Sequence, residues 1–141
     1  MTMMRRSAGR GRRLAVIAAA VILVGCVLPW WQLGGSDGIP PLSGNAFESM
    51  GIVVFIVALA TLAIVTLPYA AGDLAAGVDR WPAYTILAVA GWLAIGVRVA
   101  DLFGQGALGL PDRAPGLTLA AVGLVLLSRA AYDVARERAH R

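Results

Sequence analysis

The stretch MGIVVFIVALATLAIVTL, residues 50–67, decides the fold because it contains no charged side chain from its first residue to its last. A helix that crosses a bilayer needs about 20 predominantly apolar residues. Its Val and Ile residues would suit a buried strand in water, but in lipid the backbone must satisfy its own hydrogen bonds. The stretch is therefore predicted to be a membrane-spanning α-helix that Pro68 ends.

Three further apolar stretches flank this one, at residues 14–33, 81–103 and 116–132. Hydrophobic residues make up 59% of the 141 residues and charged residues 14%, against about 45–50% and 25% in a typical soluble domain. A chain of this length has too little interior to bury four such stretches. The composition excludes a soluble enzyme, a disordered chain and a disulfide-stapled secreted domain. We predict an all-α, polytopic membrane protein with four transmembrane helices in an antiparallel bundle.

The distribution of arginine predicts how these helices are oriented. The segments outside them are a basic tail at 1–13, an outer loop at 34–49, a cytoplasmic loop at 68–80, an outer loop at 104–115 and a basic tail at 133–141. Nearly all arginines lie in or beside the two tails and the cytoplasmic loop, and Arg113 is the exception in an outer loop. The positive-inside rule then places both termini and the 68–80 loop in the cytoplasm.

The basic N-terminal tail has a second interpretation, as a patch for nucleic acid. Its arginines directly flank a predicted span, however, and a topogenic flank attracted to anionic headgroups explains them. The sequence therefore predicts no nucleic-acid partner. The predicted partners are the lipid bilayer and either other membrane proteins or a second copy of the chain.

Aromatic residues at the ends of the stretches support the same orientation, because Trp and Tyr prefer the headgroup layer. Trp30 and Trp31 are predicted as interfacial anchors on the outer side, and Trp81 and Tyr84 on the cytoplasmic side. Arginine and aromatic placement thus agree on one topology.

The segment Leu23-Val24-Gly25-Cys26 resembles a lipobox, the signal at which a bacterial lipoprotein is cleaved and lipidated on the cysteine. A basic start and an apolar stretch precede it, and Cys26 is the only cysteine in the chain. A cleaved lipoprotein usually continues with a polar tether, whereas this chain stays apolar through Trp31. An uncleaved first helix is the favoured interpretation, and lipidation at Cys26 with three remaining spans is the alternative.

Arg98 and Asp101 are charged residues well inside the third predicted span. Their i, i+3 spacing places them on one helix face, where they can pair, and Glu48 at the start of the second span is a further partner. An arginine at the bilayer centre costs about 2.5–3.5 kcal/mol, so an idle one is not expected. The structural interpretation is a paired or snorkelling arginine that locks the outer end of the bundle. The functional one is a site for an anionic lipid or substrate.

Residues that catalytic and metal sites require are scarce. One cysteine excludes an intramolecular disulfide and a paired-thiol oxidoreductase. The only histidine is His140, which excludes a histidine-based zinc or haem site and a Ser-His or Cys-His pair within the membrane. The sequence therefore predicts no catalytic residue, no metal site and no cofactor.

The order of short motifs resembles a group of uncharacterised bacterial four-helix integral membrane proteins. Leu28-Pro29-Trp30-Trp31 matches their Leu-Pro-Trp-aromatic motif after the first helix, and Arg98 with Asp101 matches an Arg-x-x-Asp element that ends the third. Ser43-Gly44 and Phe47-Glu48 are a loose counterpart of a Ser-Gly-x-x-Glu element, with shifted spacing. The resemblance implies a four-helix architecture in a bacterial cytoplasmic (inner) membrane, and it carries no known activity.

Two classes of function follow from these observations. The favoured one is a non-enzymatic interaction or accessory subunit of the cytoplasmic membrane. The alternative is a small transporter or flippase that uses Arg98 and Asp101 near the outer leaflet. A membrane enzyme has the least support, because its acid and base groups would come from these two residues and loop carboxylates alone.

Overall fold

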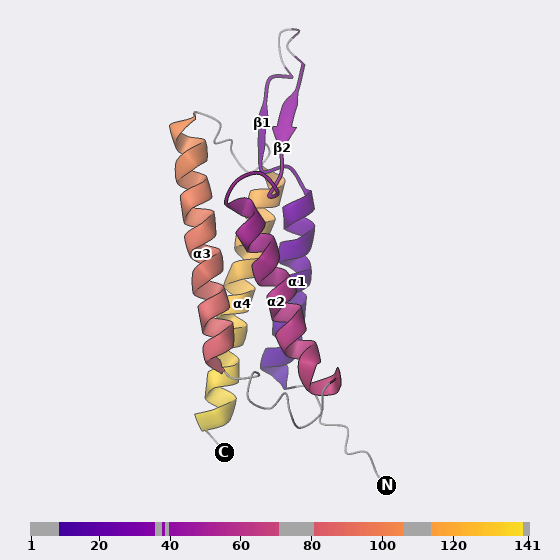
Figure 1. Ribbon diagram of the computed structural model, residues 1–141, viewed down its shortest axis with the longest axis vertical. Helices are drawn as coiled ribbons and strands as arrows, with labels where there is room; N and C mark the ends of the chain where they lie inside the picture. The colour runs from indigo at the N-terminus through magenta and orange to yellow at the C-terminus, as the bar shows by residue number, and fades with distance from the viewer. Residues whose placement is uncertain (1–8, 36–37, 39, 71–80, 106–113, 140–141) are drawn as a thin grey trace.

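A computed structural model describes residues 9–35, 38, 40–70, 81–105 and 114–139 of the chain. They form an antiparallel bundle of four helices, with a two-stranded β-hairpin extending from one end (Figure 1). In chain order, the elements are α1 (Arg10–Val27), β1 (Trp31–Leu33), β2 (Leu42–Gly44), α2 (Gly51–Ala70), α3 (Trp81–Gly104) and α4 (Pro115–Ala139). The prediction of an all-α fold built from four helices is confirmed.

The first helix differs most from its prediction, because α1 begins within the predicted basic tail and ends at Val27. Pro29 disfavours the helical conformation for the residue before it, and Leu28 accordingly has extended φ and ψ angles of −72° and 156°. Residues 31–33 then form β1. The expectation that the whole 14–33 stretch is helical is therefore wrong at its outer end.

The residues that follow the end of α1 form a β-hairpin. β1 and β2 are antiparallel, and their paired residues are Trp31 with Gly44, Gln32 with Ser43 and Leu33 with Leu42. At the root of the hairpin, the Trp30 N–H donates to the Gly44 carbonyl at 2.7 Å, and the Ala46 N–H donates to the Cys26 carbonyl at 3.3 Å. The backbone groups released at the end of α1 thus find partners in β2 and the segment after it.

Two helices continue past their predicted ends. α2 passes Pro68 and ends at Ala70, because a proline so near the end of a helix removes only one hydrogen bond of the final turns. α4 continues to Ala139, so most of the predicted tail at 133–141 is helical. Ala, Arg and Glu dominate this extension, and they favour a helix without requiring burial.

Small residues hold α1 against α4, the helix with which it makes its most extensive contact. A side-chain carbon built on Gly25 would lie 2.7 Å from the backbone nitrogen of Ala120, and one on Gly123 would lie 3.0 Å from that of Ile22. Helices in membranes associate through such close backbone approaches. α2 packs against α1 and α3, and α3 packs against α4, which closes the bundle.

Among the described residues, two helices are long and apolar enough to cross a membrane by length and composition, namely Trp81–Gly104 and Pro115–Glu137. The apolar part of α2 is shorter, Gly51–Leu67. α1 starts with arginines at positions 10, 12 and 13. The two longer helices are compatible with membrane insertion, and a crossing by all four helices stays a prediction.

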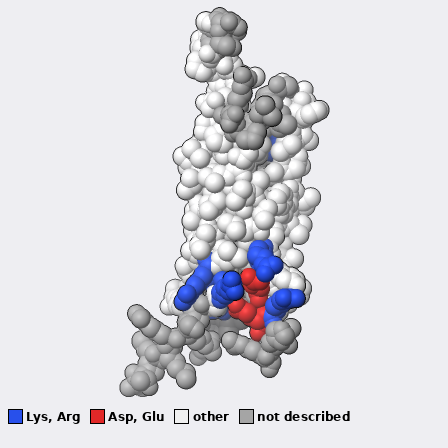
Figure 2. Space-filling model, turned by 180° about the vertical axis from the view of Figure 1, so that it is seen from behind, with Lys and Arg blue, Asp and Glu red and all other residues white. Residues whose placement is uncertain are grey.

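Charged side chains gather at the end of the bundle opposite the hairpin. Figure 2 shows the arginines and acidic residues of this end together, whereas uncharged side chains cover the middle of the same face. This end holds the start of α1 and the end of α4. Of the other arginines used to predict the topology, Arg5, Arg6, Arg80, Arg113 and Arg141 lie outside the described residues.

Candidate functional site

The strongest sequence candidate, Arg98, is buried at the hairpin end of the bundle with only 5% of its surface exposed. Its Nη2 lies 3.5 Å from Oε2 of Glu48, whose side chain is half exposed. The Nε of Arg98 is buried and has no hydrogen-bond partner. Arg98 is therefore a largely desolvated cation whose charge is balanced from one side.

Glu48 is held in place by a second donor. The indole Nε1 of Trp31 donates to the same Oε2 at 3.0 Å. Trp31 belongs to β1, Glu48 precedes α2 and Arg98 belongs to α3, so the hairpin is joined to two helices through one carboxylate. We call Trp31, Glu48 and Arg98 the outer polar cluster.

The predicted pairing of Arg98 with Asp101 is not observed. Asp101 is only partly buried, and no ion pair joins it to any residue in the described part of the chain. Of the two carboxylates proposed for Arg98, the one distant in sequence is the partner. The i, i+3 spacing permits a pair, but the buried guanidinium of Arg98 meets Glu48 instead.

In the outer polar cluster, the Glu48 carboxylate balances the charge of the buried Arg98 and accepts the Trp31 hydrogen bond that holds the hairpin to the helices. At the other end of the bundle, the described residues form a groove between α1 and α4 and another between α1 and α2, and Arg98 lines neither of them. Within the described ranges, no group of three or more His, Cys, Asp or Glu residues could hold a metal ion. This arrangement corresponds to the structural interpretation of Arg98, an internally paired arginine.

Two of the four predicted interfacial anchors are buried instead. Trp30 and Tyr84 are both 0% exposed. The Trp30 indole turns into the bundle because its Nε1 donates to the Gly25 carbonyl at 2.9 Å. Trp81 is exposed and Trp31 is half-buried, so an interfacial position for these two stays a prediction.

Cys26 lies in the last turn of α1, and its side chain is 0% exposed. The helix runs without a break through Gly25 and Cys26, and both residues are buried. Cleavage before Cys26 would remove nearly all of α1, the helix that packs most extensively on α4. The fold thus gives α1 a structural role that the lipoprotein alternative would abolish.

We expect protein extracted from membranes with detergent to retain α1 and to carry no lipid on Cys26. Intact mass spectrometry should give the 14.6 kDa expected from the sequence, and a Cys26→Ala variant should differ only by the substituted atoms. A chain that lacks the residues before Cys26 and has gained the mass of a diacylglyceryl group would contradict this. Such a result would establish the lipoprotein alternative.

Comparisons with models of known families, with curated proteins and with solved structures found no match for this chain.

Sequence reasoning identified Arg98 and Glu48 but missed two contacts. It missed Trp31 as a donor to Glu48, because that contact depends on the turn after α1 and on the strand pairing. It also missed the Glu137 carboxylate, whose Oε1 accepts the Gly11 N–H at 3.2 Å from the far end of the chain. The charged residues at 129, 133, 136 and 137 are spaced so that a helix places them on one face, and this spacing indicates a charged surface at the end of the last helix.

Proposed function

We propose that this protein is a four-pass integral membrane protein of a bacterial cytoplasmic membrane and acts as an interaction or accessory subunit. The observation that carries the proposal is the outward surface between the two ends of the bundle, which is apolar on all four helices. Its large exposed hydrophobic side chains include Val16, Ile17 and Val24 of α1, Ile52, Ile56 and Leu59 of α2, Ile86, Val89 and Leu93 of α3, and Val122 and Val125 of α4. In water such a surface would be costly, whereas hydrocarbon matches it.

The lengths of the helices support the same proposal. α2 has 20 residues, and at a rise of about 1.5 Å per residue it covers the roughly 30 Å hydrocarbon core. α1 is slightly shorter, with 18 residues, and its arginines lie at the charged end. Because α1 and α2 pack beside α3 and α4, a bilayer that surrounds the two longer helices also surrounds the shorter ones.

The hairpin supports an interaction function. It extends beyond the helices and exposes Leu33 and Leu42, and a two-stranded ribbon leaves backbone groups unpaired on both of its edges (Figure 1). Its root is fixed by Trp30 and by the outer polar cluster. In the proposed orientation, this fixed element faces the outer side of the membrane, where a partner protein can pair with it.

Single-cysteine labelling tests the proposed topology, with Cys26→Ala as the background. A membrane-impermeant maleimide should label Ser43→Cys in β2 in intact spheroplasts, and it should label Ala70→Cys at the end of α2 only after permeabilisation. Ile56→Cys, which faces the proposed hydrocarbon, should stay unlabelled in both preparations. Equal labelling of all three variants in intact cells, or recovery of the protein in the alkaline-wash supernatant, would contradict the four-pass proposal.

The same variants test the interaction function. A cysteine-directed crosslinker on Ser43→Cys, applied to native membranes, should give one adduct of constant mass, and the Ala70→Cys control should not give it. Replacing Leu42 by Asp in the Ser43→Cys background should remove the adduct. Repeated isolation of the protein alone, with no adduct at Ser43→Cys, would contradict a subunit function while leaving the topology intact.

A further inference from the structure

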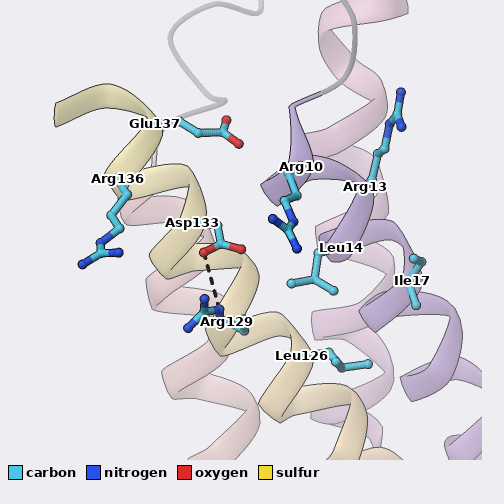
Figure 3. A pocket seen from close by; sticks show the side chains of 9 residues that line it. All are labelled: Arg10, Arg13, Leu14, Ile17, Leu126, Arg129, Asp133, Arg136 and Glu137. Carbon is cyan, nitrogen blue, oxygen red and sulfur yellow. Dashed lines mark ion pairs between the residues drawn. The ribbon is translucent and has the colours of Figure 1, made fainter. Parts of the chain in front are cut away.

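The charged end of the bundle contains a groove between α1 and α4 with a volume of about 590 Å³. The walls of the groove are apolar toward the centre of the bundle and charged toward its end. Leu14 and Ile17 of α1 and Leu126 of α4 line the part toward the centre of the bundle, whereas arginines and two acids line the part toward the end. Figure 3 shows Leu14, Leu126 and Arg10 turned toward the space between the two helices.

The acids of the groove are already engaged. Asp133 lies 3.5 Å from Nε of Arg129, and Glu137 accepts the Gly11 N–H at the start of α1. Arg136 and Arg129 both lie over the Tyr132 ring, at 4.8 and 5.5 Å from its centroid. These contacts fix the α4 side of the groove and give each of its two carboxylates a partner.

The groove has an excess of two positive charges, because four arginines and two acids line it. The side chains of Arg10 and Arg13 make no ion pair within the part of the chain that the structure describes. They lie in the first turn of α1, where the helix dipole adds further positive potential. A guanidinium binds a phosphate through two parallel hydrogen bonds, so this arrangement favours a phosphate-bearing ligand.

We propose that the groove binds one anionic glycerophospholipid of the inner leaflet, with its phosphodiester at Arg10 and an acyl chain along Leu14 and Leu126, while Arg13 at the rim of the groove adds positive potential. This inference rests on the orientation proposed above, in which the charged end lies at the cytoplasmic headgroup layer. A basic pocket between helices at that depth suits an anionic headgroup. The apolar inner wall distinguishes a lipid from a free phosphate, because only a lipid fills both halves of the groove.

The test is native mass spectrometry of the purified full chain in a neutral detergent, with dioleoyl phosphatidylglycerol or dioleoyl phosphatidylcholine added. We expect a one-to-one complex with phosphatidylglycerol. Arg10→Gln should weaken it about fivefold, and Arg10→Gln with Arg13→Gln at least about tenfold, since each arginine near a membrane surface contributes about this factor. Arg12→Gln is the matched control. It removes the same charge from the same turn of α1 but lines the groove between α1 and α2 instead, so its affinity should stay within about twofold of wild type.

Three results would overturn the proposal. Equal binding of the two lipids would show that no anionic headgroup is required. Equal losses of affinity in Arg10→Gln and Arg12→Gln would show that binding depends only on the net charge of the protein. Displacement of the lipid by millimolar inorganic phosphate or by glycerophosphoglycerol would assign the site to a free phosphate. Because the measurement is made in detergent, its failure is distinguishable from failure of the labelling experiment, which tests the topology alone.

Discussion

Replacing Gly116 by leucine is expected to prevent the native packing of α1 on α4. A side-chain carbon at this position would touch the carbonyl oxygen of Leu28 and lie 2.6 Å from that of Gly25 and 2.7 Å from Cδ1 of Trp30. Two of these three atoms belong to the backbone, so no rotamer change can relieve the clash. The Gly116 N–H also donates to the Pro29 carbonyl at 2.9 Å, which ties the start of α4 to the turn after α1.

The expected loss exceeds about 3 kcal/mol in the free energy of unfolding, the upper range for overpacking in a close-packed interior. Thermal unfolding of the purified protein in a mild detergent, followed by circular dichroism, measures it. Gly96→Leu is the matched control, because Gly96 is exposed on α3 and a side-chain carbon there meets no atom within 4 Å. A Gly116→Leu protein as stable as Gly96→Leu would contradict the observed approach of the two helices.

Removing Glu48 is expected to destabilise the protein more than removing Arg98. In Glu48→Ala, Arg98 remains buried without its counter-charge, and Trp31 loses its acceptor. Leaving a buried polar group unsatisfied costs about 1–3 kcal/mol, and we expect about 2 kcal/mol because Glu48 is half exposed and water reaches its side of the pair. In Arg98→Met the side-chain volume is nearly kept, and Glu48 retains both Trp31 and solvent. The expected cost there is below about 1 kcal/mol.

The double variant separates this explanation from a simple sum of losses. Glu48→Ala with Arg98→Met removes the charge that Glu48→Ala leaves uncompensated, so its stability should approach that of Arg98→Met alone. Thermal unfolding of the four proteins in one detergent gives the complete cycle. Strictly additive losses, or an Arg98→Met variant less stable than Glu48→Ala, would contradict the role assigned to the outer polar cluster.

The sequence predicted the helices better than it predicted their ends. Residues 51–67 and 81–103 lie within α2 and α3, because a mainly apolar stretch of that length has few alternatives to a helix. The end of α1 was missed because hydropathy does not distinguish a helix that continues through Pro29 from a chain that turns before it. The sequence does not indicate the helical extension of α4, because charged residues after an apolar stretch are also typical of a tail outside the membrane.

For the candidate site, the sequence predicts Asp101 as the first partner of Arg98 and Glu48 only as a further one. Spacing along one helix indicates which side chains can form an ion pair. Which pair forms depends on the carboxylate that reaches the buried guanidinium in the folded protein. Arg98 is enclosed on the side of α3 where Glu48 reaches it from the start of α2. Two aromatic residues were assigned to the wrong environment for the same reason, since Trp30 and Tyr84 are buried by neighbouring elements.

The apolar excess, the four helices and the concentration of arginine near the two ends of the chain could all be read from residue order, because composition and periodicity are properties of local sequence. The hairpin, the pairing of Arg98 with Glu48 and the groove between α1 and α4 could not. Each of them joins separate segments of the chain, and its geometry depends on how these segments are placed in the fold. The small-xxx-small spacing of Gly116 and Ala120 predicts close packing in general, but only the fold shows that Gly116 approaches the backbone after α1 and that Gly25 approaches α4.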